Sequence, residues 1–390
     1  RGMACCRDSG LCFFSDTSRQ VTVSDHGFPS ERGHPLHIEQ KRGLSWMYSC
    51  KKDLKKWSPK SIKSHGKDKK VPKKGQQENA NPVSLLKVMI KDCGKERNLP
   101  KGRYIHAEII QRGLFRKDIY LSTSLIGMYT RCGEVEKARK VFKQLIPARD
   151  VVSWNAMISS YAHKKGFENE ALSLFSSMRA EGLLPNAVTF SCILKACGCA
   201  RSVGLGEEIY DVIQKKGLLD HDVVLGTSLV DMYAKCGFLV KARKVFDHLL
   251  VRNIVTWNAL IAGYAEFGCG NEALECYNKM HKETSLVPNE VTFACLLKAC
   301  GSIGSVEKGE EIHSEISKRG LLRSSIVLGN SLVDMYIKCG MLTKAIEAFN
   351  ELVRRDVVSW TTLLCGYGQH GLDDETLKCY ERMQHEGVQP

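Results

Sequence analysis

Three stretches of the sequence decide the fold: DVVSWNAMISSYA at residues 150–162, NIVTWNALIAGYA at 253–265 and DVVSWTTLLCGYG at 356–368. They recur every 103 residues, so that Trp154, Trp257 and Trp360 occupy equivalent places. A fixed period of this kind is typical of a repeat architecture, in which one structural unit is copied along the chain.

Two further sets of segments lie between these stretches. VVLGTSLVDMYAKCG from Val223 matches IVLGNSLVDMYIKCG from Ile326 and, more loosely, IYLSTSLIGMYTRCG from Ile119. The third set comprises AVTFSCILKACG from residue 187, EVTFACLLKACG from residue 290 and the more degenerate VSLLKVMIKDCG from residue 83. Each period therefore contains three units, each roughly 31 to 36 residues long, which is the usual length of one helix pair.

Apolar spacing within each unit predicts two helices. Trp154, Met157, Ile158 and Tyr161 lie at i, i+3, i+4 and i+7, as on one face of a helix. Nothing between residues 83 and 390 alternates with a period of two, so no sheet is indicated. We expect glycines to end the helices, where a left-handed cap or tight turn suits them. These glycines are Gly166, Gly182, Gly198, Gly217, Gly237, Gly268, Gly301, Gly320, Gly340, Gly371 and Gly387.

One helix pair cannot bury its own apolar side, so neighbouring pairs must stack to form a core. The sequence therefore predicts an all-α fold, a solenoid of stacked helix-turn-helix units with an extended concave surface. Function is expected on that surface.

Charge and cysteine usage divide the chain. Residues 1–80 carry 17 Lys and Arg against 8 Asp and Glu, leaving +5 of the total +14 for the rest. The tract 41–74 is strongly basic and lacks apolar periodicity, which predicts disorder. Most of the 17 cysteines recur inside helical patterns, as Cys93, Cys197 and Cys300 do, which indicates buried thiols in a reducing compartment. No window is apolar enough to span a membrane, so no membrane partner is expected.

Residues 1–80 are expected to be a basic N-terminal region. Residues 1–40 are rich in Ser and Arg, as organelle transit segments are, yet they contain five acidic residues. The chain begins with Arg1, so we expect an incomplete N-terminus. A partial transit segment and an untargeted tail both fit.

The segments VVSWNAMI, LVDMYAKCG, KARKVFD and GLLPNAVTF resemble the plant organellar pentatricopeptide repeat (PPR) proteins that alternate P, L and S repeats. The resemblance covers residues 83–390 and implies a right-handed superhelical α-solenoid in a mitochondrion or chloroplast. The division is L 83–118, S 119–150, P 151–186, L 187–222, S 223–253, P 254–289, L 290–325, S 326–356 and a truncated P 357–390. The family pattern predicts further sequence beyond Pro390.

The resemblance implies that each repeat reads one base of single-stranded RNA with its fifth and last residues. A terminal Asp can only accept a hydrogen bond, whereas a terminal Asn can also donate one. The implied pairs are Thr123 with Asp150, Asn155 with Asn186, Thr227 with Asn253, Asn258 with Asn289, and Asn330 with Asp356, with Thr361 alone in the last repeat. The family rule then predicts G-Y-N-A-Y-N-U-R from 5′ to 3′, with no base assigned to the L repeats.

Structural interpretations of the same residues stay open. Asn, Thr and Asp are common at helix starts as caps. Aliphatic residues implied to sandwich the bases, Val152, Val255 and Val358, could equally be ordinary packing residues. The repeated tryptophans could be mistaken for base-stacking platforms, but their helical register with Leu, Met and Ile favours a core role.

No cofactor, metal or catalytic group is expected. Relatives of this class often end in a zinc-dependent deaminase-like domain, which needs H-x-E with a later P-C-x-x-C. This chain contains no C-x-x-C, and His106-Ala-Glu108 and His313-Ser-Glu315 occupy equivalent helix-surface places in two L repeats. The chain is therefore predicted to be a binder and not an enzyme.

The leading hypothesis is sequence-specific binding of single-stranded RNA for organellar RNA processing, in particular recognition of C-to-U editing sites with an editing factor or deaminase as protein partner. One alternative is a protein-binding α-solenoid scaffold, since related helix pairs bind peptides in a concave groove. Another is the RNA-recognition fragment of an editing enzyme whose deaminase domain follows Pro390.

Overall fold

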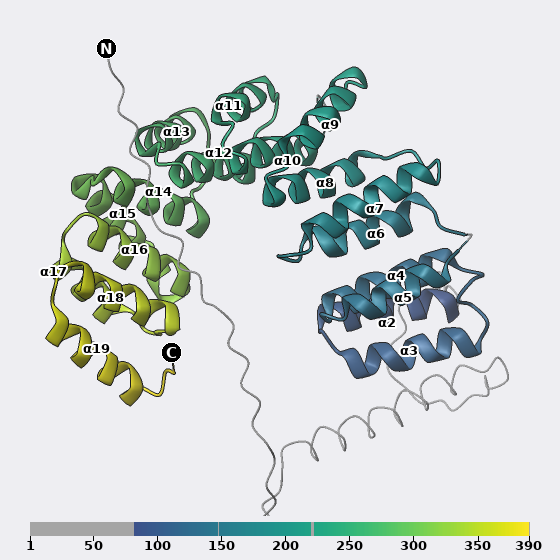
Figure 1. Ribbon diagram of the computed structural model, residues 1–390, viewed down its shortest axis with the longest axis horizontal. Helices are drawn as coiled ribbons and strands as arrows, with labels where there is room; N and C mark the ends of the chain where they lie inside the picture. Colours follow the sequence, from purple (N-terminus) through teal and green to yellow (C-terminus); the bar gives the residue numbers. More distant parts are fainter. Residues whose placement is uncertain (1–81, 147, 220–221, 390) are drawn as a thin grey trace, which may run out of the picture. The chain divides into compact units, whose positions relative to one another are not determined.

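The structure, a computed structural model, describes residues 82–146, 148–219 and 222–389. Within these ranges it contains 18 α-helices, one short 3-10 helix and no β-strand, which confirms the all-α prediction (Figure 1). The predicted N-terminal region 1–80, with its basic tract and transit segment, lies outside the described residues.

The helices follow one another as pairs. The first helices of the pairs are α2 (Pro82–Lys95), α4 (Ile119–Arg131), α6 (Val151–Ala162), α8 (Ala187–Ala200), α10 (Val223–Lys235), α12 (Ile254–Glu266), α14 (Glu290–Ile303), α16 (Ile326–Lys338) and α18 (Val357–Gln369). The second helices are α3 (Leu99–Gln111), α5 (Val135–Gln144), α7 (Glu168–Ala180), α9 (Val203–Lys215), α11 (Leu239–His248), α13 (Gly270–Glu283), α15 (Val306–Lys318), α17 (Leu342–Glu351) and α19 (Asp373–His385). The 3-10 helix η1 (Leu321–Arg323) precedes α16.

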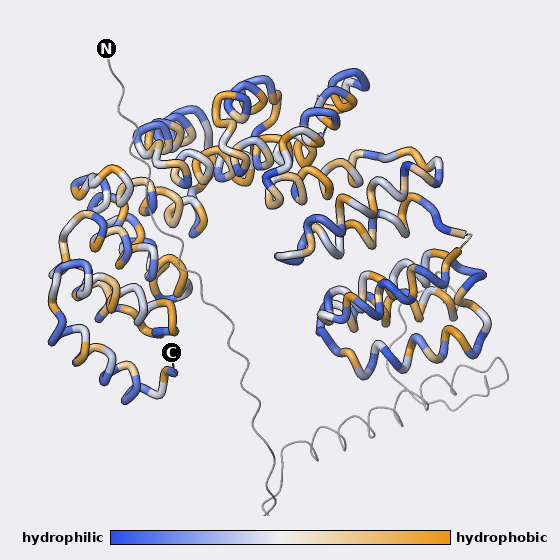
Figure 2. Tube along the Cα trace, in the orientation of Figure 1, coloured by the Kyte–Doolittle hydropathy of each residue, from blue (hydrophilic) through white to orange (hydrophobic). Residues whose placement is uncertain are grey.

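The pairs stack on one another in chain order. Each first helix packs against the first helix of the next pair, as α8 does against α10 and α10 against α12. Each second helix contacts its own first helix and the first helix of the following pair. Apolar residues recur between polar ones along the helices (Figure 2). The buried apolar side chains form one core that runs through the stacked pairs. The described chain is therefore an α-solenoid of helix pairs.

Buried tryptophans join successive pairs. Trp154, Trp257 and Trp360 are at most 2% exposed. Each meets a phenylalanine of the preceding pair edge to face, as Trp257 meets Phe246 with ring centroids 4.7 Å apart. The core interpretation of the tryptophans is confirmed, and they are not available to stack on bases.

Two glycines differ from the prediction. Gly198 and Gly301 do not end helices but lie inside α8 and α14. A Cβ on Gly198 would lie 3.2 Å from the Met232 Cα, and one on Gly301 would lie 3.4 Å from the Met335 Cα. Glycine is therefore used there for close approach between first helices, whereas the other predicted glycines have the positive φ of a helix end.

The cysteines are packing groups in the described part of the chain. Cys93, Cys197 and Cys300 are fully buried, whereas Cys132 and its equivalents at 236 and 339 are half-buried. Burial raises the pKa of Cys197 to about 12, so this thiol stays protonated at neutral pH. Among the described residues no group of His, Cys, Asp or Glu is arranged to hold a metal ion, and no helix has the length and apolar character to cross a bilayer.

Candidate nucleic-acid interface

The site begins at the helix N-termini, where a cap residue is also the last residue of the preceding unit. Asp150, Asn186, Asn253, Asn289 and Asp356 each cap the first helix of the next pair. Each forms a capping box. Its side chain accepts from the backbone N–H of the third helical residue, and the hydroxyl of that residue accepts from the backbone N–H of the cap. The capping interpretation is therefore confirmed for all five.

Three of the predicted pairs are joined by a hydrogen bond. The Asn155 Nδ2 donates to the Asn186 Oδ1 at 3.0 Å, and the Asn258 Nδ2 donates to the Asn289 Oδ1 at 3.1 Å. The Asn330 Nδ2 donates to the Asp356 Oδ1 at 3.2 Å. The fifth residue of a unit thus touches the cap that ends the same unit.

The cap fixes which atom of its side chain remains free. The Asn186 Oδ1 accepts from the Thr189 backbone N–H at 3.1 Å as well as from Asn155. An amide nitrogen could not accept these bonds, so the Nδ2 of Asn186 must point away from the helix terminus. Asn186 therefore presents a donor that has no partner within the described protein. Asn289 is held in the same way by Thr292 and Asn258.

An aspartate in the cap presents the opposite chemistry. The Asp356 Oδ1 accepts from the Ser359 backbone N–H at 2.9 Å and from Asn330, which leaves the Oδ2 as a free acceptor. The hydrogen bonds from the Ser359 backbone and from Asn330 outweigh burial and hold the pKa of Asp356 below its usual value. The carboxylate is therefore ionised at neutral pH and cannot donate.

The fifth-position asparagines are buried and fully engaged. Asn155, Asn258 and Asn330 are 7 to 9% exposed. The Oδ1 of Asn155 accepts from the Thr189 hydroxyl at 2.6 Å, and that of Asn258 accepts from the Thr292 hydroxyl at 2.8 Å. Hydroxyl, asparagine and cap therefore form one network that positions both polar residues of the pair.

The threonine pairs are not joined in this way. The Thr227 hydroxyl lies 2.7 Å from the Thr256 hydroxyl, and no hydrogen bond joins it to its predicted partner Asn253. The buried Thr123 hydroxyl has no partner in the described protein, although Asp150 caps the adjacent helix. Thr361 is exposed, and its hydroxyl donates only to the Val358 carbonyl of its own helix.

The predicted sandwich residues are exposed. Val152, Val255 and Val358 are 56 to 58% exposed at the second position of their units. The same position is exposed and apolar in five other units that were not predicted, although their common register could have indicated them. These residues are Tyr120, Val188, Val224, Val291 and Val327. A row of exposed apolar side chains thus follows the row of polar pairs.

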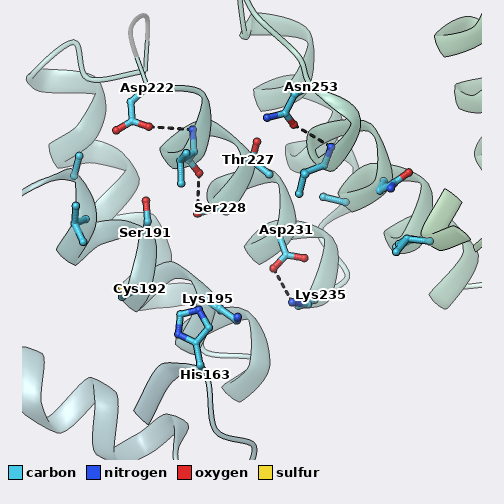
Figure 3. Close-up of a pocket in the computed structure, with 18 residues that line it drawn as sticks. His163, Ser191, Cys192, Lys195, Asp222, Thr227, Ser228, Asp231, Lys235 and Asn253 are labelled. Atoms are coloured by element: carbon cyan, nitrogen blue, oxygen red, sulfur yellow. Dashed lines mark hydrogen bonds and ion pairs between the residues drawn. The ribbon is translucent and has the colours of Figure 1, made fainter. Parts of the chain in front are cut away.

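Both rows meet in one groove with a volume of about 760 Å³. It is lined from α8, α10, α12 and α14, with Val188, Val224, Val255 and Val291 beside Thr227, Asn253 and Asn258. Figure 3 shows Asp222, Thr227 and Asn253 at one end of the groove and His163, Lys195 and Lys235 at the other. The groove thus offers apolar faces, hydrogen-bonding groups and cations to one ligand.

The units without a predicted base show another arrangement. In unit 83–118 the fifth residue, Lys87, forms an ion pair with the last residue, Asp118, at 3.1 Å and lies over the Tyr120 ring at 4.5 Å. Both reading positions of this unit are therefore engaged with other residues of the protein. Ser191 lines the groove, and Ala294 carries no polar group. His106 and His313 are not plain surface residues, because they are half-buried and bind Tyr129 and Tyr336 at 2.9 Å.

Stacked helix pairs with a repeated polar pair and a repeated apolar residue along one groove define a modular repeat protein. A family model described as "PPR repeat family" matches residues 149–199 and 252–302. A model described as "PPR repeat" matches residues 121–146, 227–254, 291–321, 330–357 and 358–388. The chain belongs to the pentatricopeptide repeat family.

Relatives of known sequence come from Arabidopsis thaliana. The chain is 36% identical over 298 residues to "Pentatricopeptide repeat-containing protein At4g18520, chloroplastic", covering 76% of this chain and 47% of that protein. It is 38% identical over 304 residues to "Pentatricopeptide repeat-containing protein At3g24000, mitochondrial", covering 78% of this chain and 47% of that protein. The chain thus spans about half the length of these relatives.

Solved structures share the fold. The pentatricopeptide repeat protein PPR10 in complex with an 18-nucleotide psaJ RNA element superposes with a TM-score of 0.64 at 20% identity. The match covers 80% of this chain and 46% of that one. PPR10 from maize, in a second structure, gives a TM-score of 0.51 at 23% identity. These likenesses establish the helical solenoid.

Proposed function

We propose that this chain binds single-stranded RNA in a sequence-specific manner, with one nucleotide at each polar pair. The observation that carries the proposal is the cap network, which leaves one free polar atom at a fixed place in Asn186, Asn289 and Asp356. Helix capping alone would not require a second, buried asparagine beside each of these caps. A binding function gives a reason for both residues.

Base selectivity follows from the free atom. A free Nδ2, as on Asn186 and Asn289, suits the ring-nitrogen acceptor of cytosine or adenine. The free Oδ2 of Asp356 suits the ring N–H of uracil or guanine. Combined with the family rule that Asn at the fifth position favours a pyrimidine and Thr a purine, these groups give G-Y-N-A-Y-N-U-R from 5′ to 3′, with Thr361 of the last unit expecting the purine.

The exposed valines supply the second contact in this proposal. Val152, Val188, Val224, Val255 and Val291 recur once per unit beside the polar pairs. An aliphatic side chain on each side of a base would shield its hydrogen bonds from water, which strengthens them. Because every base has an apolar face, this contact adds affinity without adding selectivity.

The relatives support the biological setting. Their names place them in the chloroplast or the mitochondrion, and PPR10 is named as an RNA complex. We therefore infer an organellar location and a role in RNA processing, with C-to-U editing-site recognition and a deaminase or editing-factor partner as the specific form. Organelle fractionation with an antibody to the array tests the location, and a signal outside both organelles would contradict it.

Fluorescence anisotropy with the purified chain tests RNA binding. An RNA that carries the predicted pattern should bind at least tenfold more tightly than a scrambled RNA of equal composition, since each good base contact is worth about 1 to 3 kcal/mol in duplex readout. The double substitution Asn155→Ala, Asn258→Ala should remove most of that preference. Equal affinity for both RNAs at moderate salt would contradict base reading. A double variant that still binds a protein partner of the unsubstituted chain would favour a scaffold.

A further inference from the structure

The two internal copies, residues 151–253 and 254–356, differ in charge at equivalent positions in the groove. His163 ends the first helix of the earlier copy, and Glu266 occupies the equivalent place 103 residues later. The next first helix carries a lysine at the same position in both copies, Lys195 in α8 and Lys298 in α14. The copies therefore serve as controls for each other.

The two lysines have different environments. Lys298 forms an ion pair with Glu266. Lys195 has no carboxylate within ion-pairing distance in the described part of the chain, because His163 stands where the other copy has its glutamate. Lys195 is also half-buried in the groove, beside His163 (Figure 3). A partly desolvated, unpaired ammonium is unfavourable for the free protein and favours an anion as ligand.

The surroundings add positive charge. Lys164, Lys165, Lys195, Arg201 and Lys235 line the continuation of the groove, with Glu168, Asp231 and Glu266 as the carboxylates. Two of the three carboxylates are already paired, Asp231 with Lys235 at 2.6 Å and Glu266 with Lys298. The basic residues of this groove that form no ion pair with these two carboxylates all belong to the earlier copy.

Arg201 occupies a backbone conformation that favours glycine. Its φ is +52°, and the equivalent residue of the later copy is Gly304 with a φ of +66°. A side chain in the left-handed region is disfavoured by sterics, and among the described residues other than glycine Arg201 shares it only with Arg97, at the equivalent place of unit 83–118. Arg201 is exposed and lines the same groove as Lys195, where its charge also acts on Glu266.

We propose that Lys195, with Arg201 in the same groove, binds a phosphodiester group of the RNA backbone. This contact holds the strand at the end of the groove formed by α6, α8 and α10. The proposal rests on the proposed function, because the phosphate belongs to the strand whose bases face the polar pairs. Lys195 lies one helical turn after Ser191 in α8, at the opposite end of the groove from Thr227 and Asn253 (Figure 3). Bases and phosphates of one strand can therefore be met at the two ends.

Salt dependence of RNA affinity tests this site. The logarithm of the affinity falls as the logarithm of the salt concentration rises, and Lys195→Ala should make this fall less steep by about 0.7 if it removes one phosphate contact to a single strand. It should also weaken binding about fivefold at 0.1 M salt. The loss should be the same for matched and scrambled RNA, because a phosphate carries no sequence information. Lys298→Ala, the matched control, should change the slope much less.

Exchanging the charge pattern sharpens the test. His163→Glu gives the earlier copy the acid of the later one, and should reproduce the slope of Lys195→Ala. Glu266→Gln frees Lys298 and should steepen the slope, after which Lys298→Ala should reduce it. Thermal unfolding midpoints equal to that of the unsubstituted chain exclude misfolding.

The outcomes separate the two proposals. An unchanged salt slope in Lys195→Ala, when the unsubstituted chain binds RNA with a salt-sensitive affinity, would overturn the phosphate site and leave base reading intact. Equal effects of Lys195→Ala and Lys298→Ala would also overturn it, because the pairing of Lys298 with Glu266 would then not matter. A chain that binds no RNA would overturn both.

Discussion

At the residue scale, one side chain has two tasks. Asn289 caps α14 with its Oδ1 and keeps its Nδ2 free. The resemblance to the family implied the pairing of Asn289 with Asn258, but it did not imply which atom stays free. It depends on the Thr292 backbone N–H and hydroxyl, whose positions exist only once the helix has formed.

Removing the Thr292 hydroxyl should loosen the network. Thr292→Val keeps the shape of the side chain but leaves the buried Asn258 Oδ1 without its donor. A buried polar atom that loses its partner costs about 1 to 3 kcal/mol, so the urea midpoint should fall. Discrimination between cytosine and uracil at the fifth nucleotide should weaken as well.

Thr362→Val provides the control, because the Thr362 hydroxyl donates only to the Val358 carbonyl of its own helix. We expect its stability to stay within about 0.5 kcal/mol of the unsubstituted chain. A Thr292→Val protein as stable as this control would show that the network contributes nothing.

Thiol reactivity should follow burial. Burial raises the pKa of Cys197 to about 12, and that of Cys300 likewise to about 12, so neither forms a thiolate at neutral pH. Among the cysteines that the structure describes, the exposed Cys199 and Cys365 should react with iodoacetamide first. Peptide mapping by mass spectrometry measures the order, and labelling of Cys197 at the rate of Cys199 in folded protein would contradict this packing.

At the element scale, the repeat period and the apolar spacing carried most of the prediction. Apolar residues at helical spacing marked the helices, because one face of each helix must be buried against its neighbours. Gly198 and Gly301 were misplaced, since a glycine at a close contact between helices looks in sequence like one at a helix end. The exposed valines were only partly found, because exposure depends on how neighbouring pairs stack.

A close contact between α13 and α14 gives an element-scale prediction. A Cβ on Gly270 would lie 2.6 Å from the Ala299 carbonyl oxygen and from the Ile303 Cγ2. Because a backbone oxygen cannot move aside, Gly270→Ala should destabilise the array by about 1 to 3 kcal/mol.

Gly127→Ala is the matched control in a helix interior, where an added Cβ meets nothing within 4 Å. It should stabilise the chain by up to about 1 kcal/mol, since alanine is the better helix former. Urea denaturation followed by circular dichroism measures both changes. A Gly270→Ala protein at least as stable as the unsubstituted chain would contradict the close packing of these helices.

At the scale of the whole molecule, stability should be local. Each pair contacts only its neighbours, so a defect should spread little along the array. Phe246→Ala removes the ring that meets Trp257 across the boundary between α11 and α12. Hydrogen exchange should become faster in α10 to α13 and stay unchanged in α2 and α3. Faster exchange throughout the described helices would indicate one cooperative unit instead.

The modular design could be predicted from sequence because the units are copies, and self-comparison needs no knowledge of contacts. The distribution of charge along the groove could not. The sequence places Lys195 and Lys298 at the same position, but only the structure shows Lys298 paired with Glu266 and Lys195 in no ion pair with another described residue. The charge distribution along the groove therefore depends on residues that differ between the copies, which comparison of their similar residues does not show.

The central claim is that the free atom of the cap selects the base, and reciprocal substitution tests it most directly. Asn289→Asp gives the fifth-nucleotide site the groups of the natural Asn330 and Asp356 pair, and Asp356→Asn does the reverse at the seventh. Asp and Asn cap helices about equally well, so both variants should fold.

Anisotropy titrations with cytosine or uracil at these two positions should show exchanged preferences. Asn289→Asp should change the fifth-nucleotide preference from cytosine to uracil, and Asp356→Asn should change the seventh from uracil to cytosine, each by about 1 to 3 kcal/mol. Preferences that stay as they are in the unsubstituted chain, or a loss of affinity that is equal for both bases, would contradict the claim.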